Sequence, residues 1–461
     1  MGNRLTFVFW TLFFVLTILR VSGQENVFLL SGRIITTEGT PLPFTTIFIK
    51  QNGTGTVSDP DGYFEIKLPM GEYEVTFQFM GYETVIRTIR LNEPVKVDIV
   101  MREQAIVLQN VTVYAGNEDP AYTIMRKAIA KAKFHTQQID AYTAKVYIKG
   151  RGQLTDYPWM AKKALEKEGI TKDRLFISES VSEINYTRPN KFEEKVVAIY
   201  SNGEDNNTSP NEYVFGSFYE PEIAETISPL SPKAFGYYRF EYVGSFRDRE
   251  YEISKIKVTP RSRGDSVFEG TLFIVEDWWS IHSLDFSTIK YGIDFKIKQF
   301  YHPIEDDKNR GLAWLPVSQQ FGVDGSVFGF EFEYQYLATV RDYKIELNPD
   351  LVLEMTVIDE KIQKEEAVKI KEEHSEKGQQ LQERLSSGKE ITRKELNQLM
   401  KEYEKNELKT EEDPAIISSA TFSVDSLARK KDSLYWDNIR PLPLTKNEIK
   451  GYKKSGQYGC G

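Results

Sequence analysis

Apolar and polar residues alternate along several stretches in the middle of the chain. In the clearest case, residues 328–336, Phe or Tyr occupies every second position, and Gly, Glu or Gln stands between. The same period of two runs through residues 142–149 and 293–301. A period of two indicates β-strands with one buried and one solvated face, as in antiparallel sheets. Since no crossover helices are predicted between these strands, a large antiparallel meander is the simplest topology for residues 119–350.

One amphipathic helix is expected ahead of these strands. Asp119 is a favoured N-cap residue and Pro120 a favoured first helical residue. Apolar residues then recur at helical spacing from Tyr122 to Ala132. A helix of about 18 residues is about 27 Å long, so it can cover part of a wide sheet and leave the rest open.

The strands also predict a hydrophobic face that is the candidate ligand site. Its residues are Phe295, Ile297, Phe328, Phe330, Phe332, Tyr334 and Tyr336. If part of this face is uncovered, the apolar concavity would accept an acyl chain, a lipoprotein or a segment of a neighbouring protein. In the alternative, the helix, the loop 221–232 and the C-terminal tail fill the space completely.

Residues 24–116 alternate short β-rich runs with turn signals. Strands are expected at 27–35, 45–49, 63–68, 73–80, 85–91 and 95–101. In the turn 59–62, Pro60 presets one φ angle and Gly62 accepts a positive φ. This spacing of strands and turns indicates a small β-sandwich.

The N-terminal residues predict where the protein is located, and the C-terminal residues predict a solvated segment. Residues 1–23 carry Arg4, a short apolar run and a small residue before Gln24, as a secretory signal peptide does. We therefore expect export to the periplasm or association with the outer membrane. Residues 351–461 are rich in charges of both signs, which predicts a charged helical segment followed by a C-terminal linker.

Composition narrows the function classes. The 461 residues include 59 basic and 68 acidic side chains, a net charge of −9, which disfavours a nucleic-acid binder. The single cysteine, Cys460, rules out an intrachain disulfide and a cysteine metal cluster. We expect no cofactor, and the expected partners are the outer membrane, a lipid or lipoprotein, or an envelope protein.

Histidine motifs leave one enzyme alternative open. His302 and Glu305 form a His-x-x-Glu pair, for which His374 would have to supply the third zinc ligand of a carboxypeptidase. A histidine in a loop is the simpler interpretation of His302. His282 is expected to be a packed, hydrogen-bonded strand residue that shares a face with Leu284.

Carboxylates beside tryptophans raise a second alternative. Glu276 and Asp277 precede Trp278 and Trp279, a combination that could serve a glycoside hydrolase or a carbohydrate-binding module. Hydrolysis needs two carboxyl groups that face each other across a cleft. Adjacent strand residues point to opposite faces, and these four residues are expected to form a hairpin bend.

Five motifs in order carry a family resemblance of residues 24–116. They are Gly32-Arg33-Ile34, Gly39-Thr40-Pro41-Leu42-Pro43, Gly53-Thr54-Gly55-Thr56, Asp59-Pro60-Asp61-Gly62-Tyr63-Phe64 and Gly81-Tyr82-Glu83. This stretch resembles the carboxypeptidase-regulatory-like domain, a transthyretin-like sandwich found in outer-membrane proteins of Bacteroidetes-type bacteria. The resemblance implies an accessory domain without catalytic residues.

The following region resembles the uncharacterised family that accompanies this domain in such bacteria. The matching stretches include Ala121–Ile129, Tyr147–Gly150, Phe240–Gly244, Gly270–Trp278 and Trp436–Thr445. Its pattern is also loosely similar to the curved half-barrel sheets of lipoprotein carriers. Proteins with this arrangement usually continue into a C-terminal outer-membrane β-barrel, which we expect this chain to lack.

The sequence therefore predicts a mainly β protein with an N-terminal sandwich, a curved antiparallel sheet with one helix, and a charged helical segment. The leading hypothesis is a non-enzymatic envelope protein that serves as a binding or assembly module. A carbohydrate-binding module is the first alternative. A zinc carboxypeptidase-like enzyme or a glycoside hydrolase is the second.

Overall fold

The structure, a computed structural model, describes residues 27–107, 118–172, 174–189, 191–202, 216–262, 266–290, 292–308, 310–349, 351, 419–440, 444 and 448–449. The expected signal peptide and most of the expected charged segment, including His374, lie outside the described residues. Within the described part of the chain the fold is mainly β, with a sandwich, a large curved sheet and few helices, as predicted.

The N-terminal sandwich consists of two sheets. One has the order β4-β1-β7, with β8 also paired to β1, and the other has the order β3-β2-β5-β6. The strands are β1 (Val27–Thr36), β2 (Thr46–Ile49), β3 (Thr54–Val57), β4 (Tyr63–Pro69), β5 (Gly71–Gln78), β6 (Val85–Leu91), β7 (Val95–Lys96) and β8 (Ile99–Met101), with the 3₁₀ helix η1 (Lys50–Asn52). Alternation in β4 buries Phe64, Ile66 and Leu68 in the core between the sheets.

The predicted turn before β4 has the expected geometry. One carboxylate oxygen of Asp59 accepts hydrogen bonds from the backbone N–H groups of Asp61 (2.9 Å) and Tyr63 (2.8 Å). Gly62 has a φ of 80°. A Cβ atom at this position would lie 2.5 Å from the carbonyl oxygen of Ile34, so the turn requires glycine for both conformation and space.

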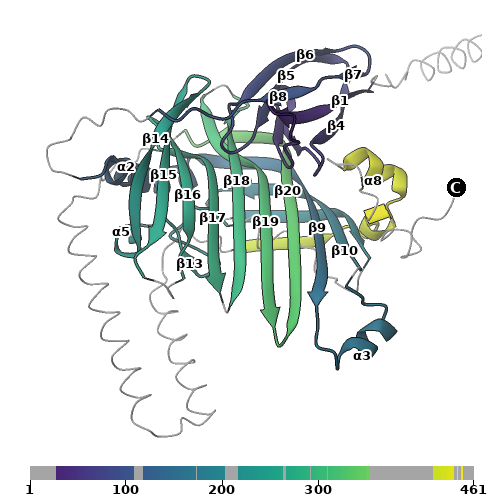
Figure 1. Cartoon of the computed structure of the whole chain (residues 1–461). Helices are drawn as coiled ribbons and strands as arrows, with labels where there is room; N and C mark the ends of the chain where they lie inside the picture. Colours follow the sequence, from purple (N-terminus) through teal and green to yellow (C-terminus); the bar gives the residue numbers. More distant parts are fainter. Residues whose placement is uncertain are drawn as a thin grey trace, which may run out of the picture.

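Within the described residues, eleven strands form one curved sheet (Figure 1). Its order is β14-β15-β16-β17-β18-β19-β20-β9-β10-β11-β21, antiparallel throughout except for the parallel pair β11–β21. The strands are β9 (Ile139–Asp156), β10 (Phe176–Thr187), β11 (Lys191–Ser201), β14 (Tyr238–Asp248), β15 (Tyr251–Pro260), β16 (Glu269–Val275), β17 (Ser280–Lys290), β18 (Ile293–Glu305), β19 (Leu312–Val327), β20 (Phe330–Leu347) and β21 (Ser419–Val424). The meander is therefore real from β14 to β20, and β20 then pairs with the early strand β9.

Short elements connect or cover the sheet. They are α2 (Pro120–Gln137), α3 (Lys162–Lys167), the small hairpin β12 (Glu222–Ile223) and β13 (Thr226–Ile227), α5 (Ala234–Tyr237), η2 (Ala428–Lys430) and α8 (Ser433–Ile439). Among the helices of the described residues, none has both the length and the apolar character needed to cross a membrane.

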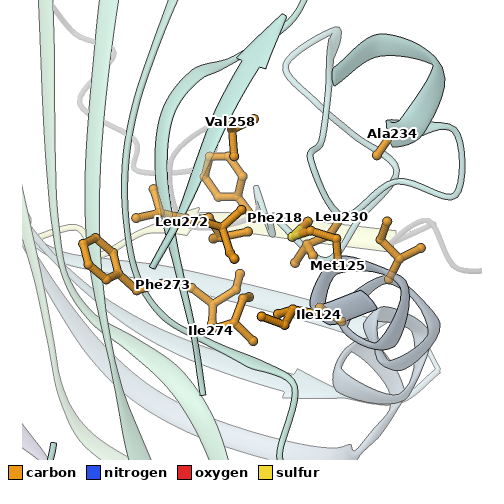
Figure 2. Packing of buried hydrophobic residues seen from close by; sticks show 14 of the residues in the cluster. Ile124, Met125, Phe218, Leu230, Ala234, Val258, Leu272, Phe273 and Ile274 are labelled. Atoms are coloured by element: carbon orange, nitrogen blue, oxygen red, sulfur yellow. The ribbon is translucent and has the colours of Figure 1, made fainter. Parts of the chain in front are cut away.

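Helix α2 covers one end of one face of the sheet, which we call the helix face. Asp119 caps the helix, since its carboxylate accepts the N–H of Ala121 at 2.9 Å. Figure 2 shows Ile124 and Met125 of α2 packed against Leu272 and neighbouring side chains. The predicted helix is thus confirmed, and its apolar stripe explains why it lies on this face.

The N-terminal sandwich packs on the opposite face, which we call the sandwich face. Thr46 of β2 and Ser318 of β19 share a buried hydrogen bond of 2.7 Å between their hydroxyl groups. The amide of Gln320, two residues further along β19, donates to the carbonyl oxygen of Phe44 at 3.1 Å. The sheet is therefore a middle layer between the sandwich and α2.

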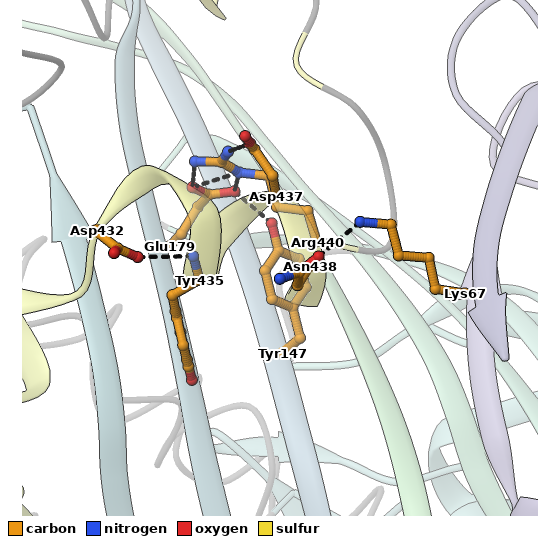
Figure 3. A network of polar contacts seen from close by, with 8 residues as sticks. All are labelled: Lys67, Tyr147, Glu179, Asp432, Tyr435, Asp437, Asn438 and Arg440. Carbon is orange, nitrogen blue, oxygen red and sulfur yellow. Dashed lines mark hydrogen bonds and ion pairs between the residues drawn. The ribbon is translucent and has the colours of Figure 1, made fainter. Parts of the chain in front are cut away.

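Helix α8 also packs on the sandwich face, over β9 and β10. Trp436 is buried there against Tyr147 and Val181. The Arg440 guanidinium forms ion pairs with the buried Glu179 carboxylate, at 2.8 Å for the shortest contact, and Tyr147 donates a 2.5 Å hydrogen bond to the same carboxylate (Figure 3). This network fixes the C-terminal described segment to the sheet.

Candidate functional site

A cavity of about 350 Å³ lies on the helix face, beside the C-terminal end of α2. It falls within the range of about 300–1,000 Å³ that is usual for small-molecule sites. Its walls come from α2, β9, β10, β11, β18, β19, β20 and the loop 216–220. The lining side chains include His135, Tyr142, Ala144, Val146, Ile184, Tyr186, Phe192, Tyr219, Gln299, Tyr301, Trp314, Gln319, Ala338, Val340 and Tyr343.

Register explains why these residues meet. Leu284 packs in the α2 cluster, and it lies directly across from Gln299, which lies across from Gln319, which in turn lies across from Ala338. Directly opposed residues share a face of the sheet. The cavity therefore continues the face that α2 covers and occupies the part beyond the end of the helix.

Several polar side chains in the wall bond to one another, whereas His135 Nε2 and Trp314 Nε1 have no hydrogen-bond partner among the described residues. Tyr301 donates to Gln299 at 2.8 Å, Gln299 donates to Gln319 at 2.7 Å, and Gln319 donates to the hydroxyl of Tyr336 at 2.7 Å. Each amide in this chain has a partner within the protein. These amides do not depend on water for their hydrogen bonds, so a ligand that displaces water from the cavity leaves them satisfied.

The ionisable groups of the inner wall, away from Arg188 and Glu220 at the edge, are held neutral. Burial raises the pKa of Tyr142, Tyr219 and Tyr301 above the ordinary value of 10. Burial, together with the charge of Lys131, lowers the pKa of His135 to about 4. The inner wall is consequently uncharged near neutral pH, which favours an uncharged apolar ligand.

Charged groups lie at the edge of the cavity. Arg188 is exposed and donates to the carboxylate of Asp140 at 3.0 Å. Glu220, on the facing loop, also lines the cavity. An apolar chain inside the cavity would place its polar end beside these two side chains.

The predicted hydrophobic face is largely where the alternation placed it. Phe295, Ile297, Phe330, Phe332 and Tyr334 are half-buried, and Tyr336 is buried. The list has one exception: Phe328 lies in the turn between β19 and β20, with a φ of 52°, and is 94% exposed. Alternation cannot continue through a turn, so Phe328 does not belong to the face.

None of these seven residues is among the described residues that line the cavity. Tyr336 contacts the wall through Gln319, and its ring packs on Phe321 with centroids 5.1 Å apart. The predicted face therefore adjoins the cavity as a continuous part of the same sheet face. Its role in binding stays a prediction.

The residues that form the cavity were largely missed by the sequence analysis. Alternation did mark Tyr142, Ala144 and Val146 as one strand face. Tyr219 and Trp314 carried no signal, because each joins the wall only when distant strands pair. The pairing of β9 with β20, about 190 residues apart in the chain, brings the two sides together.

His302 differs from the sequence expectation. It lies inside β18, not in a loop, and is 1% exposed. Its ring stacks on Phe48 of the sandwich at 4.3 Å, and Arg249 lies 3.1 Å from its Nδ1. Burial, with the charge of Arg249, holds the pKa of His302 well below 6.5.

This placement separates the two residues of the candidate zinc motif. Glu305 lies three positions along the same strand from His302 and pairs with Lys50 of the sandwich at 3.4 Å. His374 lies outside the described residues. Among the residues that the structure describes, no group of three His, Cys, Asp or Glu side chains is arranged to hold a metal ion.

His282 is packed and hydrogen-bonded, as expected for a strand histidine. Its Nε2 lies 2.9 Å from Asp248 and 2.9 Å from Gln78 of the sandwich. Burial raises the pKa of Asp248, but the hydrogen bond and charge of His282 outweigh this and lower it to about 2. A β-bulge opposite Phe273 leaves His282 without an opposed residue on β16. Simple alternation with Leu284 therefore does not apply.

The carboxylate and tryptophan cluster forms the expected hairpin bend. Residues 276–279 connect β16 and β17, with positive φ at Asp277 and Trp279. Trp278 and Trp279 pack partly into the α2 cluster, and Lys127 of α2 lies 4.3 Å above the Trp279 ring. These rings are therefore engaged with the protein's own helix, which does not favour a sugar-stacking platform.

Comparison with family models gives two matches. Residues 30–113 match the CarboxypepD_reg-like domain, and residues 124–343 match a family of unknown function, DUF5686. The chain joins a CarboxypepD_reg-like domain to a DUF5686 domain. Both families expected from the sequence motifs are thereby confirmed. All the described residues that line the cavity, from His135 to Tyr343, lie within the DUF5686 match.

A curated relative and two solved structures show further likenesses. TonB-dependent receptor P39 of Formosa agariphila is 26% identical over 116 residues, which are 25% of this chain and 11% of the receptor. A DUF1329 family protein from Desulfovibrio piger has a TM-score of 0.23 at 9% identity, covering 53% of this chain and 99% of that one. A LolA superfamily protein from Nitrosomonas europaea has a TM-score of 0.19 at 11% identity, covering 50% and 95%.

These structural likenesses are too low in TM-score to carry an argument about function. The receptor match covers about a tenth of that protein, so it indicates context and not activity. Taken together, the family matches and the receptor are consistent with a module of the cell envelope.

Proposed function

We propose that this protein is an exported module of the cell envelope that binds an apolar ligand of acyl-chain type in the cavity beside α2. The observation that carries the proposal is the cavity of about 350 Å³ with an aromatic and aliphatic wall. Gln299 and Gln319 in its wall are hydrogen-bonded within the protein, and burial keeps His135 neutral. Such a wall disfavours charged ligands and accepts apolar ones.

Export is supported by the signal-peptide features of residues 1–23 and by the receptor relative. Mass spectrometry of the protein from an envelope fraction should find Gln24 as the first residue. A mature mass that still includes Trp10 would contradict this part of the proposal.

A non-enzymatic role is part of the same proposal. The described histidines nearest to a catalytic pattern, His282 and His302, contact the sandwich and lie in the interface between the two domains. Because both imidazole rings are packed against the sandwich, neither is accessible to a substrate. This supports a binding module over the zinc-enzyme alternative.

Ligand binding can be tested with an environment-sensitive fluorescent fatty acid added to the full mature chain. We expect saturable binding to the wild type. Ala144→Phe places a ring in the cavity and should weaken binding at least about tenfold, because the space for the chain is lost. The matched control is Thr143→Phe, which adds the same side chain at the exposed neighbouring position of β9.

Three results would contradict ligand binding in the cavity. They are absence of saturable binding to the wild type, equal binding by Ala144→Phe, and an equal loss in Thr143→Phe. Circular dichroism must show the same fold for all three proteins. If Ala144→Phe is unstable, Ala144→Leu provides a smaller change at the same place, with a correspondingly smaller loss of binding.

A further inference from the structure

Two neighbouring turns at one end of the sheet expose large apolar side chains. The β19–β20 turn carries Val327 and Phe328, which are 39% and 94% exposed. The segment after β9 carries Trp159 and Met160, which are 84% and 72% exposed. We call these four residues the tip surface.

The two turns touch each other. A Cβ atom on Gly329, directly after Phe328, would lie 3.2 Å from the ring of Pro158, directly before Trp159. Figure 1 places the ends of β19, β20 and β9 at the same lower end of the molecule, away from the sandwich. The four side chains therefore belong to one end of the protein, not to scattered sites.

Folding gives no reason for Phe at position 328. The turn has two residues with positive φ, 52° at Phe328 and 79° at Gly329. Asn or Asp with Gly fits such a hairpin turn, whereas a bulky residue is strained at positive φ. Phe328 therefore costs conformational energy and, at 94% exposure, gains no packing in return. This cost points to a contact outside the chain.

We propose that the tip surface inserts into the surface of a lipid bilayer that contains anionic lipid. The side chains project from turns, and none of the four lines the cavity beside α2 or the hollow bordered by Phe44 and Gln320. Trp is favoured at the boundary between lipid headgroups and acyl chains, and Phe and Met add apolar area below it.

The charge beside the tip surface fits the same occupant. Helix α3 begins two residues after Met160 and has three lysines, of which Lys162 pairs with the one glutamate of the helix, Glu166, at 3.9 Å. The whole chain, in contrast, has a net charge of −9. Basic side chains next to inserted aromatic residues are attracted to anionic headgroups, whereas the acidic remainder of the surface is repelled by them.

The tip surface is independent of the cavity, although the two are joined by one strand face. From the tip, Phe330, Phe332 and Tyr334 of β20 lead along the sheet to Tyr336, which bonds to Gln319 in the cavity wall. An apolar ligand that leaves a bilayer at the tip would meet this face before it reaches the cavity. Failure of ligand binding would leave the membrane contact standing, and the reverse also holds.

The experiment is co-sedimentation of the full mature chain with vesicles of phosphatidylethanolamine and phosphatidylglycerol. The double variant Trp159→Ser with Phe328→Ser should lose at least about tenfold in partitioning, since burying each ring in the bilayer supplies most of the affinity. The control variant Tyr63→Ser with Met70→Ser removes two exposed apolar side chains from the sandwich and should bind like the wild type. Neither pair is buried, so both variants should keep the wild-type melting temperature.

Two further measurements identify the contact. Trp159 fluorescence should shift to the blue on adding vesicles, and the shift should vanish in Trp159→Phe. Lys162→Gln with Lys163→Gln should weaken binding to the anionic vesicles. If the tip surface binds a protein and not lipid, the wild type should not co-sediment with any of the vesicles, and that result overturns the proposal. Equal partitioning of the tip variant and the wild type would overturn it as well.

The cavity variant separates this proposal from the proposed function. Ala144→Phe should keep full vesicle binding while it loses the fluorescent fatty acid. The tip variant should keep fatty-acid binding in the absence of vesicles. If Ala144→Phe also loses vesicle binding, the bilayer contact runs through the cavity and the tip proposal is wrong.

Discussion

The buried pair between Arg440 and Glu179 offers a quantitative test of how the C-terminal described segment is held. The side chains are 2% and 0% exposed, and the guanidinium contacts both carboxylate oxygens. The perturbation is Arg440→Leu, which keeps an apolar stem and removes the charge. Glu179 then remains buried without the guanidinium, while Tyr147 still donates to it and the charge of Lys149 lies nearby.

The expected cost follows from the fate of the carboxylate. Breaking a buried pair by removing one partner costs about 3–5 kcal/mol. Glu179 can limit this cost by taking up a proton, since its ordinary pKa is 4.5. Neutralising it at pH 7 costs about 3.4 kcal/mol, at about 1.36 kcal/mol per pH unit, and at pH 5 only about 0.7 kcal/mol. The deficit of the variant should therefore shrink by roughly 2–3 kcal/mol between pH 7 and pH 5.

The wild type should not share this trend at Glu179. Burial raises the pKa of Glu179, but the hydrogen bonds and charge of Arg440 outweigh burial and lower it below 4.5. A carboxyl group with a lowered folded pKa loses its stabilising effect only as the pH falls below the unfolded value. Both assay conditions lie above that value, so the pair stays ionised in the wild type.

The assay is urea unfolding of wild type and variants, compared at the same pH. The double variant Glu179→Gln with Arg440→Leu removes both charges and should recover much of the loss at pH 7. Arg188→Leu breaks the exposed pair with Asp140, 3.0 Å apart, and should cost less than about 1 kcal/mol. A loss in Arg440→Leu no larger than in Arg188→Leu, or a deficit independent of pH, would refute the reasoning.

Two other predictions concern the turn and the buried histidines. Gly62→Val should lower the unfolding free energy by more than about 1 kcal/mol, because φ is 80° and the new side chain would meet the Ile34 carbonyl; Gly81→Ala, at φ 86° with open space around it, is the control for conformational strain alone and should cost less. His135 and His302 have lowered pKa values, so their unfolded forms bind protons first and stability should fall as the pH drops below 6.5. For His135, with a folded pKa of about 4, the loss of unfolding free energy at pH 5 is about 2 kcal/mol. Urea unfolding at pH 7 and pH 5 should show that the decrease in stability between the two pH values is smaller by this amount in His135→Phe.

Local sequence patterns predicted the strands and the main turn well, since both are set by neighbouring residues. Alternation marked the faces of β9, β18 and β20, and Gly62 marked its own turn. The same rule failed at Phe328, where the turn uses Phe-Gly in place of Asn-Gly. It also failed at His302, because the alternation was followed only to Tyr301, whereas pairing with β19 continues the strand to Glu305.

The cavity could not be predicted in the same way. Its walls meet only because β20 returns to pair with β9, and that pairing leaves no mark in either strand. Tyr219 and Trp314 reach the wall from a loop and a distant strand. The face was visible in the sequence, but how much of it α2 leaves uncovered depends on the width and curvature of the whole sheet.

The contacts between sandwich and sheet bear on which parts of the protein can move when a ligand binds. Gln78, Phe48 and Thr46 of the sandwich each pair with one buried group of the sheet. Separation of the two layers would remove the contact of His282 with Gln78 and would expose the buried Asp248 and His282 pair to water. Buried polar contacts of this kind must open together, which makes separation costly. The sandwich therefore acts as a fixed support for the sheet, and under the proposed function a ligand would enter on the opposite face, between the loop 216–220 and the end of α2.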